Sequence, residues 1–191
     1  MSVPDVPHRL VERMAEAMTR AVAAIPGRRI IAVVVIYHHM PPDSDPDPVE
    51  IYACSREHRE ELLHLYPPPD GAVYVWSNLE FDDYLPGDIQ DRELEAAWLD
   101  VNAFAQRVYA RTDLNSSEFD DTELPRAVLV DVCRVLNDGG WKPSRPSQLA
   151  PDAVIYPAAF GGVDPDTPDN LRAVLSETQR QRLDAAGLLP I

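Results

Sequence analysis

The feature that most constrains this chain is the continuous apolar run from Ile30 to Tyr37, IIAVVVIY. It is rich in β-branched residues and has no polar alternation, so both of its faces are apolar. Such a run is typical of a strand that lies at the centre of a sheet and is covered on both sides. It is far shorter than the ~20 residues that a membrane-spanning helix needs. We therefore expect a buried central strand and no membrane association.

Three further segments are predicted to be strands, at 49–54, 72–76 and 153–160. The first follows the central run after a short polar loop, PPDSDPDP, which favours an antiparallel hairpin. Pro157 lies inside the last segment, and a proline in a strand indicates a sheet edge or a bulge because it cannot donate to the ladder.

Apolar residues at helical spacing predict helices over 7–25, 56–66, 91–111 and 125–137, and a last helical region from Thr167 that Gly187 closes. Ser55 can cap the second helix, and Gly139 with Gly140 suits a helix end. Ser77 and Glu80 have capping-box spacing, which predicts a helical turn over NLEFDDY. The expected fold is one α+β domain over 1–191. It has a mostly antiparallel sheet of about four strands with helices packed on it, and a helical C-terminal tail from about 167.

The net charge of −15 is concentrated in one part of the chain. Residues 41–100 hold sixteen acidic residues against three arginines, a net charge of −13, whereas residues 1–40 carry +2 and residues 101–191 carry −4. A strongly negative field repels phosphate backbones and anionic lipid. The sequence therefore disfavours nucleic acid and membranes as partners and favours a basic protein partner. A need for solubility, or an acid-biased proteome, explains the same excess and stays open.

Several patterns of catalytic and cofactor sites are missing from the sequence. It contains no glycine-rich phosphate loop and no G-x-S-x-G nucleophile motif, so we predict no cofactor and no catalytic residue. Cys54 and Cys133 lie in apolar segments, where thiols are usually inert core residues. The N-terminal residues lack an apolar signal core, so a cytoplasmic location is expected.

The predicted hairpin tip and the strand end before it hold residues that suit a metal: His38, His39, Asp43, Asp45 and Asp47. The aspartates match the first ligands of a calcium loop, but the template then needs a glycine and a late glutamate where this chain has Pro48 and Cys54. Adjacent histidines on a strand point to opposite faces. We therefore predict no metal site, and keep as an alternative a metal-binding protein or hydrolase that uses this hairpin.

The segment WSNLEFDDYLPGD mixes carboxylates with aromatic residues. Asp82 and Asp83 would lie about 100° apart on a helical turn and would not converge on one ion. Acidic residues that steer a partner, with aromatics that become buried against it, are typical of protein-binding surfaces. The predicted partner-binding residues are Asp43, Asp45, Asp47, Trp76, Glu80, Phe81, Asp82, Asp83 and Tyr84.

The layout resembles a family of small bacterial domains of unknown function. The resemblance is carried by a strand pair followed by Ser55, by Trp76 with the acidic turn at 82–83, and by Gly140 with Trp141. Proteins of this kind are often linked with immunity proteins of bacterial toxin systems. The resemblance implies an acidic protein that neutralises a basic toxin, and it carries over no catalytic residues.

The leading hypothesis is a non-enzymatic acidic binding protein with a basic protein partner, in the manner of an immunity protein. A third alternative is a structural or regulatory dimer, which would need an exposed apolar patch on the helix at 91–111. The oligomeric state is not readable from the sequence.

Overall fold

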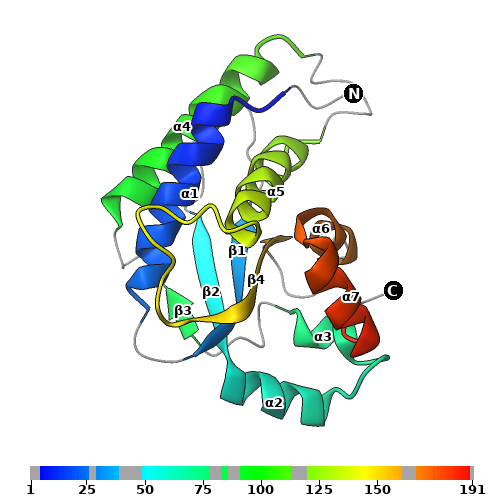
Figure 1. Ribbon diagram of the computed structural model, residues 1–191. Coiled ribbons are helices and arrows are strands. Elements are labelled where there is room, and N and C mark those ends of the chain that lie inside the picture. Colours follow the sequence, from blue (N-terminus) through cyan, green and yellow to red (C-terminus); the bar gives the residue numbers. More distant parts are fainter. Residues whose placement is uncertain are drawn as a thin grey trace.

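The computed structural model describes residues 5–25, 29–38, 49–77, 83–85, 91–112, 120–160 and 167–189, and for 83–85 it describes the backbone. Four strands form one sheet in the order β3-β2-β1-β4 (Figure 1). Their bounds are β1 Ile30–Tyr37, β2 Glu50–Ser55, β3 Asp83–Leu85 and β4 Leu149–Ala159. β2 pairs antiparallel with both β1 and β3, whereas β4 pairs parallel with β1.

The central position predicted for the IIAVVVIY run is confirmed. β1 lies between β2 and β4, and seven of its eight residues are buried. The α+β class is also confirmed. The expectation of a mostly antiparallel sheet holds only in part, because β4 runs parallel to β1. β4 is an edge strand, as Pro157 indicated, so the donor that proline lacks is not needed by an outer neighbour.

Two local predictions are wrong. The AVYVW segment forms the short helix α3, Ala72–Val75, and not a strand. The amides of Tyr74 and Val75 bond back to the Gly71 carbonyl at 3.0 and 3.3 Å, so local hydrogen bonds replace a ladder. Asp83 and Tyr84, the last two residues of the predicted helical turn, lie instead in strand β3, because the free edge of β2 pairs with its backbone; the rest of that turn lies outside the described residues. Tertiary pairing thus overrides local propensity at both places.

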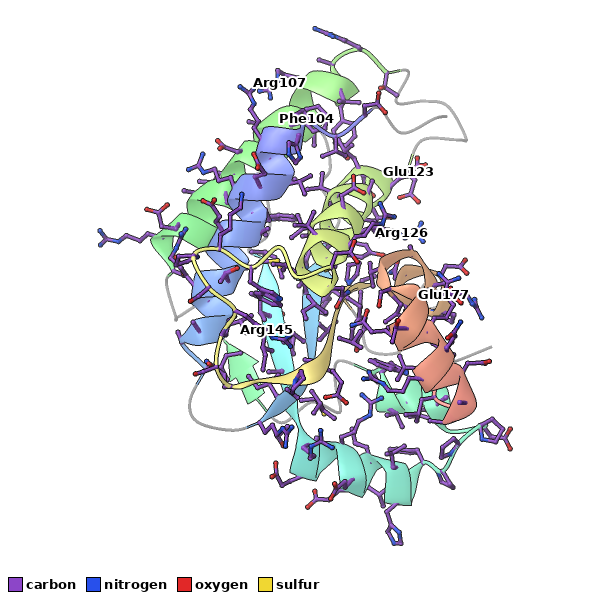
Figure 2. All side chains as sticks on the ribbon, viewed as in Figure 1. Phe104, Arg107, Glu123, Arg126, Arg145 and Glu177 are labelled. Atoms are coloured by element: carbon purple, nitrogen blue, oxygen red, sulfur yellow. The ribbon has the colours of Figure 1, made fainter. Side chains whose placement is uncertain are left out.

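Three helices form a group beside the sheet: α1 His8–Ala23, α4 Arg92–Tyr109 and α5 Glu123–Asn137. Figure 1 shows α1 and α4 side by side, and ion pairs join Arg13 to Asp100 and Arg20 to Glu93, the latter at 3.8 Å. These pairings run in opposite chain directions, so the two helices are antiparallel. In Figure 2, Arg107 points away from α4, whereas Arg126 lies between α5 and the C-terminal helices.

The remaining helices are α2 Arg56–Leu65, α6 Thr167–Val174 and α7 Glu177–Ala185. α6 packs against β4 and α5, and α7 leads from it toward the end of the sheet where α2 lies (Figure 1). The predicted cap is confirmed, since the Ser55 hydroxyl accepts from the His58 amide at 3.2 Å. The predicted helix end at Gly139 is confirmed by its φ of 90°, a conformation that favours glycine. None of the helices in the described ranges combines the length and apolar character that crossing a membrane requires.

Candidate anion-binding pocket

A pocket of about 200 Å³ lies where α2, β4 and α7 meet. Its walls are mostly apolar, and four of its lining residues are charged. The lining residues are Ile31, Arg56, Arg59, Leu63, Trp76, Asp152, Val154, Arg182, Leu183, Ala186 and Leu188. Three arginines against one aspartate make the pocket locally cationic, although the whole chain carries a net charge of −15.

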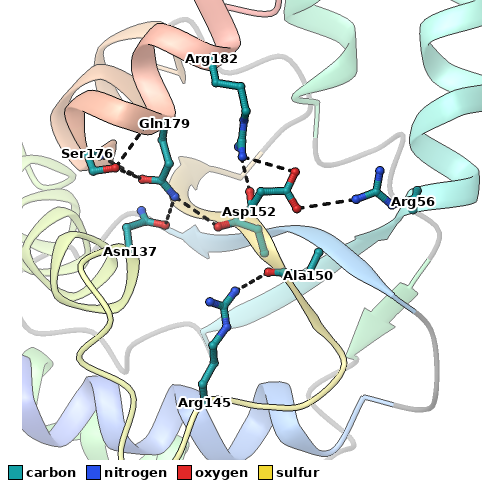
Figure 3. A network of polar contacts seen from close by, with 9 residues as sticks. Arg56, Asn137, Arg145, Ala150, Asp152, Ser176, Gln179 and Arg182 are labelled. Atoms are coloured by element: carbon teal, nitrogen blue, oxygen red, sulfur yellow. Dashed lines mark hydrogen bonds and ion pairs between the residues drawn. The ribbon is translucent and has the colours of Figure 1, made fainter.

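A bulge in β4 brings Asp152 to this pocket. Ile30 pairs with Leu149 and Ala32 pairs with Val154, so β1 advances two residues while β4 advances five. The extra residues leave the regular ladder, and such bulges re-aim side chains. Asp152 lies within this bulge (Figure 3) and is one of the residues that line the pocket.

Side chains from other elements hold the bulge in place. Its backbone carbonyls accept hydrogen bonds from Arg145 Nη2 to Ala150 O, from Arg182 Nη2 to Asp152 O at 3.0 Å, and from Gln179 Nε2 to Ala153 O at 3.3 Å. Figure 3 shows Gln179 also bonded to Ser176, within the capping box that starts α7. The bulge and the start of α7 are therefore one connected unit.

The Asp152 carboxylate is shared by two of the three arginines. Arg56 Nη2 lies 3.6 Å from Oδ1, and Arg182 Nη1 lies 3.3 Å from Oδ2 (Figure 3). Both arginines are partly exposed, so water screens these pairs. Asp152 makes no ion pair with Arg59 among the described contacts, although both residues line the pocket.

Arg59 is the unusual member of the group. It is only 5% exposed, and its guanidinium carbon lies 4.2 Å from the centre of the Trp76 ring. Among the described residues it makes no side-chain hydrogen bond and no ion pair. Burial lowers the pKa of Arg59 below its ordinary value because the charged form loses hydration; repulsion from Arg182 adds to this, while Asp152 acts in the opposite direction.

Two further observations make the local positive charge costly. Arg56 and Arg59 both stand within the first four residues of α2, where the helix dipole disfavours cations. The Nε atom of Arg56 is buried and has no hydrogen-bond partner among the described residues. A bound anion would relieve both costs through charge-assisted hydrogen bonds.

Trp76 lines the pocket, although its side chain is almost fully buried in the core. It is 1% exposed, and its Nε1 donates to the Leu188 carbonyl at 2.6 Å. The Tyr156 hydroxyl donates to the Trp76 carbonyl at 2.6 Å, and the two rings meet edge to face. Trp76, predicted from the sequence to contact a partner, is thus a core residue in this structure.

The structure does not bring the other predicted partner-binding residues together. Asp43, Asp45, Asp47, Glu80, Phe81 and Asp82 lie outside the described residues, and Asp83 and Tyr84 are described only as backbone of β3. The predicted acidic and aromatic surface therefore stays a prediction.

The histidine part of the alternative metal site has a mixed outcome. His39 lies outside the described residues. His38 Nε2 lies 3.8 Å from Glu50, and its ring stacks on Phe160 at 4.7 Å. In the described part of the chain, no three residues of the metal-ligating types come close enough to hold an ion.

Both cysteines are buried, as the sequence predicted. Burial raises the pKa of Cys133 well above its ordinary value, so this thiol is not activated as a nucleophile. The apolar stripe of α4 packs into the core; Leu99, 50% exposed, is the exposed large apolar residue of that helix among the described positions. A single leucine is less than the apolar patch that the dimer alternative would need.

Sequence reasoning missed the pocket because its members are far apart in the chain. One local signal was present: Arg59 stands three residues before Leu62, on the side of α2 that is buried. A cation on the buried side of an amphipathic helix is rare unless it is paired. Asp152 and Arg182 left no comparable signal, because the β4 bulge and the α7 docking that place them are tertiary features.

Comparisons with protein-family models, with curated proteins and with solved structures find no match for this chain.

Proposed function

We propose that the protein binds a small anion in the pocket between α2, β4 and α7. The observation that carries this proposal is Arg59, a buried guanidinium that faces the pocket without a hydrogen bond or ion pair to any described residue. Burying an uncompensated charge is strongly unfavourable, and a charge of this kind is retained where something pairs with it. The proposed role is binding, since the lining residues include one carboxylate, and two arginines already hold it.

The test is an NMR titration that follows the Nε–H group of Arg59 at constant ionic strength. Acetate, 4-methylpentanoate and inorganic phosphate are added separately against a chloride reference. We expect at least one anion to shift this signal saturably, because it forms hydrogen bonds with the guanidinium. Binding measured by calorimetry should disappear in Arg59→Gln.

Arg180→Gln is the matched control for that titration. Arg180 lies on α7, is exposed and is outside the pocket, so the variant loses an arginine without changing the site. Equal loss of binding in both variants, or no Arg59-dependent binding of any of the three anions, would refute the proposed function.

A second candidate function is the acidic protein-binding role that the sequence and its resemblance to immunity proteins suggest. Its support in the structure is the outer side of α2, where Glu57, Glu60 and Glu61 line a surface hollow together with His64 and with Leu65, which is 66% exposed. Carboxylates on the same helix side as an exposed apolar residue suit a basic partner such as a toxin.

This second candidate predicts a salt-sensitive complex with a basic protein. Reversing Asp82 and Asp83 to lysine, or reversing the three α2 glutamates, should reduce co-purification with that partner, because the steering charges change sign. If co-purification resists both sets of reversals and added salt, the acidic residues do not form the binding surface.

A further inference from the structure

The charges and the lining of the pocket restrict the kind of anion that it can accept, given the anion-binding function proposed above. Of the three lining arginines, Arg56 and Arg182 are both engaged with Asp152. Arg59 alone has no acidic partner within ion-pair distance among the described residues. Arg59 is therefore the lining guanidinium whose donors are all available for an anion among the described residues, and one guanidinium matches one carboxylate.

The position of Arg59 favours a planar anion. Its guanidinium lies over the Trp76 ring, which hydrogen bonds to Leu188 and contacts with Tyr156 hold in place. Guanidinium donors lie in the plane of the group and match a carboxylate through two parallel hydrogen bonds. By charge alone, three arginines against one carboxylate would balance a phosphate dianion, but a phosphate has no apolar part to bury against the apolar residues that line most of the pocket.

The rest of the pocket favours an apolar body on that anion. The uncharged lining residues besides Trp76 are Ile31, Leu63, Val154, Leu183, Ala186 and Leu188. The volume of about 200 Å³ lies below the roughly 300–1,000 Å³ of pockets for drug-sized ligands. It exceeds the roughly 150 Å³ of an engineered apolar cavity that binds benzene. Nucleotides are therefore too large, and a group of a few carbon atoms fits.

We infer that the pocket binds a monocarboxylate with a small apolar body, the carboxylate on Arg59 and the body against the wall formed by Leu63, Val154 and Leu183. Such a group can come from a free organic acid or from the C-terminal residue of a peptide that ends in an apolar side chain.

Calorimetric titrations with four probes test this inference: 4-methylpentanoate, its amide, acetate and inorganic phosphate. We expect 4-methylpentanoate to bind about tenfold tighter than acetate or more, since each buried methylene adds to affinity. The neutral amide should bind at least about tenfold more weakly than the acid, because it cannot neutralise Arg59.

The variant Leu63→Ala tests the contact of the apolar body separately from the contact of the carboxylate with Arg59. Leu63 is partly buried in the apolar wall, so its truncation should weaken 4-methylpentanoate several-fold and leave acetate unchanged. Acetyl-Gly-Gly-Leu with a free or an amidated C-terminus identifies the source of the carboxylate. Tighter binding of the free peptide than of 4-methylpentanoate assigns it to a peptide end, and weaker binding assigns it to a free acid; both support the inference.

Other outcomes would overturn the inference. Tighter binding of phosphate, or equal binding of the acid and its amide, would exclude an apolar monocarboxylate. If phosphate or acetate then still required Arg59, the proposed anion-binding function would survive while the ligand class would be wrong. If no probe bound in an Arg59-dependent way, both would fail.

Discussion

Replacing Arg59 with methionine is expected to raise the free energy of unfolding by about 1–3 kcal/mol in buffer without an organic anion, although it removes a buried contact. Methionine has a similar length, needs no hydration and makes favourable contacts with aromatic rings, so it can replace the guanidinium over Trp76. The same variant should lose all anion-dependent stabilisation, because the group that pairs with the anion is gone.

The pKa of Arg59 explains why its replacement is expected to stabilise the folded state. Burial lowers this pKa below the ordinary value of arginine, so the folded state disfavours the proton that the unfolded state holds at neutral pH. Keeping the charge therefore opposes folding at every pH below that ordinary value. A residue that lowers stability and faces a pocket fits a trade-off between stability and function.

Chemical denaturation at neutral pH, with and without 4-methylpentanoate, measures both effects. Arg180→Met is the control. Arg180 is exposed, paired with Glu177 and outside the pocket, so its loss should change stability by less than about 1 kcal/mol with or without the anion. A loss of more than about 1 kcal/mol in Arg59→Met would show that Arg59 stabilises the fold through Trp76, and the case for a ligand would lose its main support.

Replacing Asn137 with alanine should lower the free energy of unfolding by about 2–4 kcal/mol. The Asn137 side chain accepts from the Ile155 amide at 3.1 Å and donates to the Ile155 and Val174 carbonyls at 2.7 and 3.1 Å. It pairs with both backbone groups of Ile155 as a neighbouring strand would, on edge strand β4. Alanine would leave these buried groups without partners, and each one costs about 1–3 kcal/mol.

The same variant should also weaken anion binding. Gln179 Nε2 lies 3.5 Å from Asn137 Oδ1 and bonds to the β4 bulge that carries Asp152 (Figure 3). Loss of Asn137 therefore loosens one support of the pocket, which makes it a positioning residue. We expect a several-fold loss of affinity for 4-methylpentanoate, measured by calorimetry well below the unfolding transition.

Asn102→Ala is the matched control for stability. Asn102 lies on α4, is half-buried, and its Oδ1 has no hydrogen-bond partner among the described residues. Because alanine also favours a helix, we expect a change of no more than about 0.5 kcal/mol. If Asn137→Ala cost no more than this control, the pairing of Asn137 with β4 would not stabilise the protein.

The main elements could be predicted from the sequence because their signals are local. The β-branched run at Ile30–Tyr37 has no polar side, so it favours a central strand of the sheet, where both of its faces are buried. The apolar stripe of the helix at 92–109 and the cap at Ser55 likewise depend on residues within a few positions of one another.

The short segments around Trp76 could not be predicted in the same way. AVYVW has strand-forming residues, yet it forms a helix because two of its amides bond to the Gly71 carbonyl and the side chains of Ala72, Val75 and Trp76 are buried in the core. Asp83–Leu85 became a strand because β2 offered an unpaired edge. Segments of three to five residues have propensities too weak to compete with such partners.

The sequence by itself determined the class of the fold, its central strand and its long helices, since hydrophobic periodicity within one element decides which side must be buried. Only the tertiary structure decided which charged side chains lie close together. Arg59, Asp152 and Arg182 come from three distant elements, and they converge because a bulge in β4 and the docking of α7 set their positions. Whether a charge is paired or left unpaired depends on distances of a few ångströms between such elements, and local sequence patterns do not encode those distances.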